Sequence, residues 1–211
     1  MKIEMGESLF YSWLRHVKKC PIVHTNWKQS NSWELQNVET IEKLMKNADE
    51  HFKTKYDYEV FKRNTLSLLL RQAEIDVIGI SYSRDEDKVY AVDVAYHEAG
   101  LNYGSKIDSV LRVVKKILRT SMCINGYFNA KKAEIIFAAP KITPATLSVI
   151  TPTIEDINGV FDNVNLGYSA RIIANSDFKE EVLEPIMKLS KNESNTNELF
   201  LRAYQLTNMF K

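Results

Sequence analysis

The chain has 211 residues, of which 45% are hydrophobic and 26% are charged, and its formal net charge is +1. This length and composition match one soluble globular domain that can bury a full core. A net charge near zero excludes a basic field over the whole molecule, so any contact with nucleic acid must come from a local patch.

The two cysteines, Cys20 and Cys123, fit neither a zinc site nor a disulfide framework, which favours a reducing cytoplasm. Glu4 and Glu7 interrupt the first apolar run, so we expect no signal peptide there. No apolar run reaches the length of a membrane span. We therefore expect a cytoplasmic protein that has no contact with a membrane.

The N-terminal third predicts helices around one short strand. Residues 4–19 carry apolar side chains at helical spacing, and Pro21 ends this helix. Glu7 lies on or beside the apolar stripe. It is either a first-turn acid favoured by the helix dipole or an acid directed at a functional site. Further elements are a strand at 22–28, a helix at 34–53 and a short helix at the end of 56–72.

The central feature of the chain is a predicted β-hairpin with strands at 74–82 and 88–97. If its charged turn centres on residues 84–85, facing residues have numbers that sum to 169, and Asp76 then faces Asp93. Facing residues lie on one side of the sheet with their Cβ atoms about 5 Å apart. Two carboxylates this close need a cation between them, or one of them has a raised pKa.

A glycine-punctuated loop follows the hairpin and leads into a helix that begins at Ser105. Asp108 lies three residues further on, as in a capping box, and the helix runs to about Ser121. One side of this helix is apolar and buried. The other side is basic, and it is either a solvated face or a contact for phosphates. The basic side consists of Arg112, Lys115, Lys116 and Arg119.

The second half of the chain alternates strands with helices, which predicts an α/β fold with a mixed sheet flanked by helices. Strands are expected at 132–139 and 168–174. A helix begins at residues 143–144, and Pro152 breaks or restarts it. Asn175 and the two residues after it are expected to cap the next helix.

Two segments are expected in the domain organisation, an α/β domain at 1–189 and a polar linker with a C-terminal amphipathic helix at 190–211. The apolar side of that last helix either closes the core or meets a partner, including a second copy of the chain. This side consists of Leu199, Ala203, Leu206 and Phe210.

The order of elements and the central acids resemble the PD-(D/E)XK nuclease superfamily, the restriction-endonuclease-like fold, over about residues 4–185. In that family a helix carries a glutamate, one strand carries an aspartate, and the next strand carries an acid, one variable residue and a lysine. By this resemblance Glu7, Asp76 and Asp93 match the three acids. Ala95 stands where the lysine belongs.

The resemblance implies metal-dependent hydrolysis of phosphodiester bonds in nucleic acid, DNA in the first place. Asp76 and Asp93 would bind Mg²⁺ or Mn²⁺, because such hard cations take carboxylate oxygens and keep several waters. The bound cation would polarise the phosphodiester and make a water more acidic. Glu7 would be the third acid of this site.

The absent lysine leaves three further interpretations. The family lysine positions or deprotonates the attacking water, and alanine cannot do either. Lys106 is the first candidate to replace it, followed by Lys116 or Lys115, while His97 could accept a proton instead. Without a replacement the chain would be a degenerate nuclease fold that binds nucleic acid or a protein without cutting. An unrelated α/β enzyme that uses His97 on a small substrate is the third interpretation.

A purely structural role for the two central aspartates also stays open. Either acid could pair with Arg71, with Lys88 or with the N-terminus of a helix. Burial of an unpaired charge would be costly in either case.

Overall fold

The computed structural model of the chain describes residues 4–62, 64–83, 86–191, 193 and 196–210. Its strands are β1 (Ile22–Trp27), β2 (Ile75–Ser81), β3 (Lys88–Val94), β4 (Lys132–Ala139) and β5 (Gly167–Ala174). They form a five-stranded sheet in sequence order. β1, β2 and β3 are antiparallel neighbours, whereas β3, β4 and β5 run parallel. The protein is therefore a mixed α/β protein, as the alternation of elements predicted.

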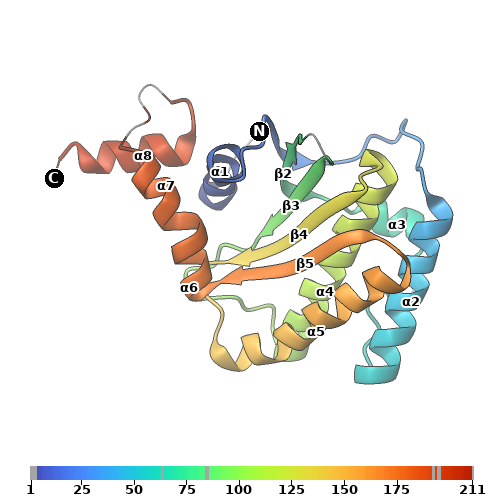
Figure 1. The fold of residues 1–211 in the computed structure, drawn as a ribbon. Coiled ribbons are helices and arrows are strands. Elements are labelled where there is room, and N and C mark those ends of the chain that lie inside the picture. Colours follow the sequence, from blue (N-terminus) through green and yellow to red (C-terminus); the bar gives the residue numbers. More distant parts are fainter. Residues whose placement is uncertain (1–3, 63, 84–85, 192, 194–195, 211) are drawn as a thin grey trace.

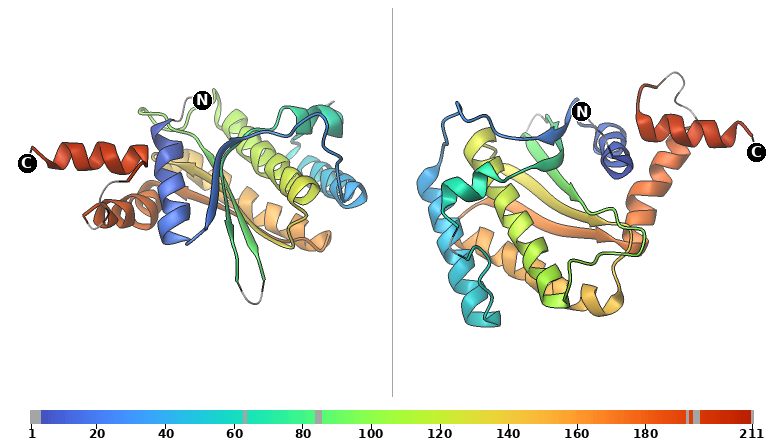
Figure 2. Two further views of the ribbon diagram at one scale, coloured as in Figure 1. Left: turned by 90° about the horizontal axis from the view of Figure 1, so that it is seen from above. Right: turned by 180° about the vertical axis from the view of Figure 1, so that it is seen from behind.

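Helices cover both faces of this sheet and give the molecule three layers (Figures 1 and 2). One face carries α2 (Val38–Tyr56), α3 (Leu66–Arg71), α4 (Lys106–Cys123) and α5 (Pro144–Asn163). The other face carries α1 (Met5–Ser12), α7 (Glu184–Leu189) and α8 (Leu199–Asn208). Shorter turns are η1 (Trp13–Val17), η2 (Ile124–Phe128), α6 (Asn175–Asp177) and η3 (Phe178–Leu183).

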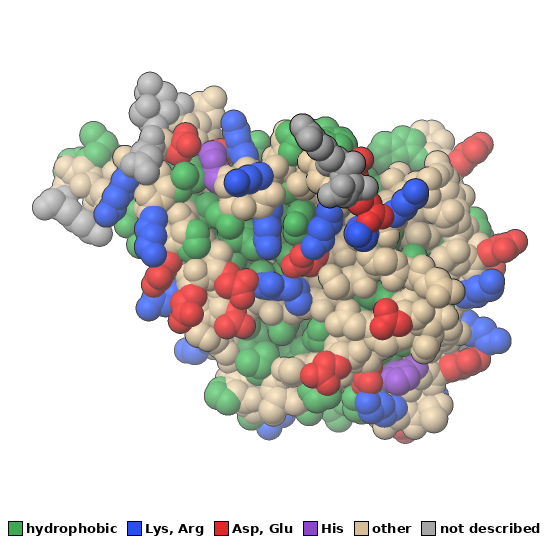
Figure 3. All heavy atoms as spheres, in the orientation of Figure 1, with side chains coloured by type: hydrophobic (Ala, Val, Ile, Leu, Met, Phe, Trp, Pro, Cys, Tyr) green, Lys and Arg blue, Asp and Glu red, His purple; other side chains and the backbone are tan. Residues whose placement is uncertain are grey.

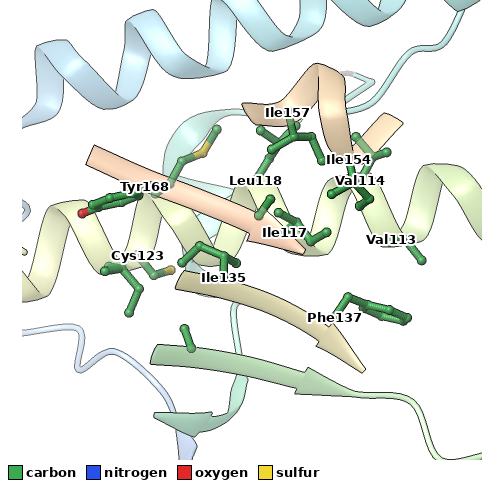
Figure 4. Packing of buried hydrophobic residues seen from close by; sticks show 14 of the residues in the cluster. Val113, Val114, Ile117, Leu118, Cys123, Ile135, Phe137, Ile154, Ile157 and Tyr168 are labelled. Carbon is green, nitrogen blue, oxygen red and sulfur yellow. The ribbon is translucent and has the colours of Figure 1, made fainter. Parts of the chain in front are cut away.

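Side-chain alternation along β4 explains why both faces need helices. Ile135 and Phe137 belong to the core on the α4 face, Ile136 and Ala138 belong to the core on the α1 face, and all four are fully buried. A strand without a polar side suits the parallel part of a sheet that is covered on both faces. Figure 4 shows α4 and α5 packed on the sheet through buried aliphatic side chains, including Val113, Val114, Ile117 and Leu118.

The helix α4 begins where the sequence predicted. The hydroxyl of Ser105 accepts a hydrogen bond from the Asp108 amide (3.1 Å), and the Asp108 carboxylate accepts one from the Ser105 amide (3.1 Å). This capping box satisfies amides that have no partner inside the helix. The side chain of Thr143 caps α5 in a similar way, with Pro144 as the first helical residue.

The register of the central hairpin is confirmed. Ile78 pairs with Ala91 and Ile80 pairs with Val89, so the numbers of facing residues sum to 169. The predicted turn centre at residues 84–85 lies outside the described residues. The register nevertheless fixes which residues of β2 and β3 share a face of the sheet.

Two predicted helix boundaries were wrong. α2 begins at Val38 and not at residue 34, because Asn37 adopts a left-handed conformation (φ 54°) that does not fit the interior of a right-handed helix. Pro152 does not break α5, which continues through it to Asn163. The carbonyl that loses its helical partner belongs to Ser148, which is exposed, so water can bind it.

The predicted cap at Asn175 was also wrong. Asn175 is itself the first residue of α6, has a positive φ of 55°, and makes no side-chain cap. Its amide side chain instead donates to the carbonyl of Ile142 (2.9 Å) and accepts from the amide of Ile142 (2.9 Å). Asn175 therefore joins the end of β5 to the loop that follows β4.

The C-terminal helix α8 rests on α1 through a different side from the one predicted. Leu201 is fully buried in the core shared with α1, and the amide of Phe200 donates to the hydroxyl of Ser8 (2.8 Å). Leu206 and Phe210, on the predicted apolar side, are 57% and 84% exposed. That side does not close the core.

Basic and acidic side chains are interspersed over the face of the molecule that Figure 3 shows. Described ion pairs such as Lys88 with Glu134 (2.6 Å) and Lys55 with Asp156 (2.6 Å) follow the same mixed pattern. The small net charge is therefore not the sum of two large regions of opposite sign on this face.

Across the described parts of the chain, every helix is too short or too polar to cross a lipid bilayer.

The α4 helix offers a test of the packing between helix and sheet. Ile117 is fully buried and Ile107, on the same helix, is 54% exposed. We expect Ile117→Ala to lower the free energy of unfolding by about 3 kcal/mol, because it removes buried methyl groups and leaves a cavity. Ile107→Ala should change it by less than about 0.5 kcal/mol. Urea denaturation of both variants measures the difference, and equal effects would contradict the packing described.

Candidate functional site

Asp76 lies at the start of β2, where the β2–β3 ladder ends. The last backbone pair is Val77 with Val92. Beyond it, the side chain of Asp76 takes over the role of the backbone, because its Oδ2 accepts a hydrogen bond from the amide of Val94 (2.6 Å). This bond holds the carboxylate against β3, beside Asp93.

Asp93 is buried between β3 and α4, and it is only 1% exposed. Its Oδ2 accepts a hydrogen bond from the hydroxyl of Thr120 (2.8 Å), and its Oδ1 accepts one from the ammonium of Lys116 (3.4 Å). Both oxygens of a fully buried carboxylate are thus partnered by one helix. Because a buried polar group is costly when it is left without a partner, these contacts offset the cost of burying this side chain.

The position of Lys116 corrects the prediction of a uniformly exposed basic side on α4. Lys116 and Thr120 are four residues apart and therefore lie on the same side of the helix. That side borders the buried face, so the Lys116 side chain is 30% exposed and reaches Asp93. Of the two basic side chains proposed as structural partners of the acids, Lys88 forms its ion pair with Glu134 (2.6 Å) instead, and Arg71 is exposed.

The charges of this cluster act strongly on one another. Burial and then the neighbouring Asp93 carboxylate raise the pKa of Asp76 to about 7, although Lys116 and the Val94 amide oppose the rise. Burial tends to lower the pKa of Lys116, but the charges of Asp93 and Asp76 outweigh burial and raise it. Lys116 therefore stays cationic, and Asp76 carries a proton for part of the time at neutral pH.

Glu7 lies near this cluster from the opposite side of the sheet. It is 9% exposed, and its Oε2 accepts hydrogen bonds from the side chain of Asn26 (3.0 Å) and from the amide of Glu4 (3.2 Å). Its charge is also one of those that raise the pKa of Asp76. Glu7 is thus a helix-capping acid that also contributes to the field of the site.

The other predicted residues make no hydrogen bond or ion pair with either aspartate among the described residues. Ala95 is buried, and its amide donates to the carbonyl of Ala138 (2.8 Å). His97 is exposed beyond the end of β3, with its ring against Tyr103. Lys106 is exposed at the first residue of α4, ten residues or about 15 Å along the axis before Lys116. The structure brings Lys116 and not Lys106 to the acids.

Tyr103 is a site residue that the sequence did not reveal. The guanidinium of Arg112 lies over its ring, 4.8 Å from the centroid, and Arg112 is one helical turn before Lys116. Burial raises the pKa of the Tyr103 phenol, Lys116 and Arg112 oppose this rise, and Asp93 adds to it. The phenol therefore lies within electrostatic reach of the acids. The only signal in the sequence was the glycine-punctuated loop that carries it.

Three other cations gather on the outer side of α4. Burial lowers the pKa of Lys115, and the like charges of Arg119 and Lys62 lower it further. We call Arg112, Lys115 and Arg119 the basic ridge, which has the spacing of one helix face. A ridge of crowded like charges beside a buried acidic pair is suited to contact with a polyanion.

The two aspartates fit a divalent cation in the type and number of donors they offer. Carboxylate oxygens suit Mg²⁺, which usually keeps several waters and takes only one or two protein carboxylates. Within the described residues, no group of three or more His, Cys, Asp and Glu side chains is arranged to hold a metal. Asp76 and Asp93 offer two such carboxylates, and the ammonium of Lys116 lies beside Asp93.

Comparisons with protein-family models, with curated proteins and with solved structures found no match to this chain.

The raised pKa of Asp76 makes the stability of the protein depend on pH. Since the folded chain holds a proton that the unfolded chain has lost between about pH 4 and pH 7, stability falls as pH rises through this range. Asp76→Asn stays uncharged and keeps an oxygen that accepts from Val94. We expect this variant to exceed the wild type in unfolding free energy by on the order of 2 kcal/mol at pH 8.

Urea denaturation in EDTA at pH 4.5 and at pH 8 checks this expectation. The advantage of Asp76→Asn should fall to about a quarter of its pH 8 value at the lower pH, where the folded wild type is protonated and the unfolded chain is partly protonated. Asp162→Asn, a change at an exposed aspartate, serves as the matched control and should show no such pH dependence. A constant difference at both pH values would argue against a raised pKa at Asp76.

Lys116 should stabilise the folded chain only through the two acids. We expect Lys116→Met to lower the unfolding free energy at pH 8 by about 2 kcal/mol, because it leaves Asp93 without its cation. Adding Asp93→Asn to that variant should recover part of the loss. Lys106→Met is the matched control at an exposed position of the same helix. A double variant no better than Lys116→Met alone would show that the loss comes from packing.

Proposed function

We propose that this chain is a metal-dependent nuclease-like protein that hydrolyses phosphodiester bonds in DNA, on a restriction-endonuclease-like fold. The observation that carries the proposal is the ammonium of Lys116 beside two neighbouring carboxylates. Lys116 comes from a helix and supplies the positive charge that Ala95 cannot supply from β3. The proposal therefore keeps the chemistry of the PD-(D/E)XK motif and moves its lysine.

The topology supports the same proposal. The chain runs from α1 to β1, through α2 and α3 to the β2–β3 hairpin, and then through α4 to β4, which is parallel to β3. This is the order of elements on which the resemblance to the superfamily rests. By the same resemblance, Glu7 on the first helix, Asp76 on β2 and Asp93 on β3 would match the three acids of the family motif.

Each side chain of the site has a role that follows from its contacts. Asp76 and Asp93 hold a divalent cation, and Thr120 keeps Asp93 in the orientation that this requires. Lys116 orients the attacking water and stabilises the negative charge that develops on the phosphate. When bound, Mg²⁺ or Mn²⁺ supplies polarisation of the phosphodiester and a more acidic water.

A second candidate is a nuclease fold that binds DNA without cutting it. The observation that favours it is the burial of Asp93, which is 1% exposed, has the Lys116 ammonium beside it and accepts a hydrogen bond from the Thr120 hydroxyl. When a protein cation already balances the charge of the carboxylates, a metal ion is not required to balance it. Cleavage and metal binding separate the two candidates.

Cleavage assays on DNA with Mg²⁺ or Mn²⁺ test the leading proposal. We expect Asp93→Asn to abolish cleavage and Lys116→Ala to lower its rate by about 100-fold or more, the usual range for a positioned proton-transfer or charge-stabilising group. Lys106→Ala, at the exposed end of the same helix, should cut at the wild-type rate. Lys116→Ala combined with Ala95→Lys should recover part of the activity, because it returns the lysine to the strand.

Calorimetry with Mn²⁺ provides an independent readout. Wild type should bind the metal, and Asp76→Asn and Asp93→Asn should not. Equal cleavage by wild type and Asp93→Asn would assign the activity to a contaminant. DNA binding without cleavage or metal binding would instead establish the non-cutting candidate.

A further inference from the structure

The loop between β3 and α4 carries two ring side chains to the basic ridge. The rings of His97 and Tyr103 meet edge to face with their centroids 5.7 Å apart, and the guanidinium of Arg112 covers Tyr103 at 4.8 Å. The positive φ of Gly104 (105°) and a hydrogen bond from the Tyr103 amide to the hydroxyl of Ser109 (3.3 Å) set the path of this loop. These contacts place three flat groups next to one another.

The three groups remain accessible. His97 and Arg112 are exposed and Tyr103 is half-buried. None of the ion pairs found among the described residues includes Arg112. Its guanidinium thus has one side against Tyr103 and no ion-pair partner among the described residues, although its charge helps to lower the pKa of Asp108 on the same helix. Flat cationic and aromatic groups of this kind are the surfaces on which unpaired nucleobases stack.

We propose that His97, Tyr103 and Arg112 form a stacking platform for nucleobases, and that the substrate of the neighbouring site is single-stranded DNA. The inference rests on the proposed function and specifies its substrate. Arg112 lies one helical turn, or about 6 Å, before Lys116, so a base on the platform belongs to a nucleotide next to the phosphate at Lys116. Lys115 and Arg119 contact the phosphates that follow.

The burial of the acids favours a single strand over a duplex. Asp93 is 1% exposed, and the loop with Tyr103 stands beside it. A rigid duplex keeps its bases stacked inside and cannot offer them to a platform, whereas a single strand can turn a base outward at little cost. Stacking also adds affinity that does not depend on salt, in contrast to the phosphate contacts of the ridge.

Fluorescence anisotropy in EDTA tests the platform without any cleavage. The probes are a labelled 20-nucleotide single strand of mixed sequence and a hairpin duplex that contains the same sequence. We expect wild type to bind the single strand at least about tenfold more tightly than the duplex. Tyr103→Ala should weaken single-strand binding by about tenfold and duplex binding by less than about twofold, the size of one lost base stack.

Three further variants act as controls. Tyr103→Phe keeps the ring and should bind within about twofold of wild type. Tyr82→Ala removes another exposed tyrosine beyond the far end of β2 and should leave both affinities unchanged. Lys115→Ala should weaken the binding of both probes and reduce the slope of log K against log salt concentration by about 1. Tyr103→Ala should not change that slope.

A single strand with 2-aminopurine reports stacking directly, because the fluorescence of this base falls when it stacks. At saturating protein, wild type and Tyr103→Phe should quench it and a folded Tyr103→Ala should not. Equal binding of duplex and single strand, or quenching that survives in Tyr103→Ala, would overturn the platform and leave the nuclease proposal standing. Stacking by a protein that never cleaves would support the platform and overturn the nuclease proposal. Binding of neither probe would overturn the platform, and the cleavage assay in Mg²⁺ or Mn²⁺ would then decide the nuclease proposal by itself.

Discussion

Two carboxylates lie together where the β2–β3 ladder ends, and the rest of the site depends on how their charge is balanced. Asp76 is held to β3 by the amide of Val94, and Asp93 is buried under α4. The ammonium of Lys116 and a proton that Asp76 keeps up to about pH 7 balance the pair. Without these two positive charges, burial of the acids would oppose folding of the central hairpin.

The fold supplies that balance through α4. Its apolar side packs on the parallel strands, which fixes the rotation of the helix, and this rotation turns Lys116 and Thr120 toward Asp93. The outer side of the same helix then carries the basic ridge. One element thus closes the core, neutralises the acids and presents cations to solvent. Arrangements that hold like charges together at some cost in stability are typical of functional sites.

The sequence predicted the backbone of the site better than its side chains. Two strands rich in Val, Ile and Tyr and the charged turn assumed between them predicted the correct register, because pairing in a hairpin follows from local residues. They did not show that Lys116 rather than Lys106 reaches the acids, since that depends on the rotation of α4 against strands far away in the chain. Tyr103 was missed for a similar reason. Its role depends on how a loop closes, and loops carry little periodic signal.

Carboxyl-detected ¹³C NMR of Asp76 in metal-free buffer tests the central claim most directly. The claim is that Asp76 shares a buried charge balance with Asp93 and Lys116. It predicts that Asp76 titrates near pH 7 in the wild type and at a higher pH in Lys116→Met, because the cation that opposes the rise is gone. Titration near pH 4 in both proteins would contradict the account, because the two acids would then be independent and exposed to solvent.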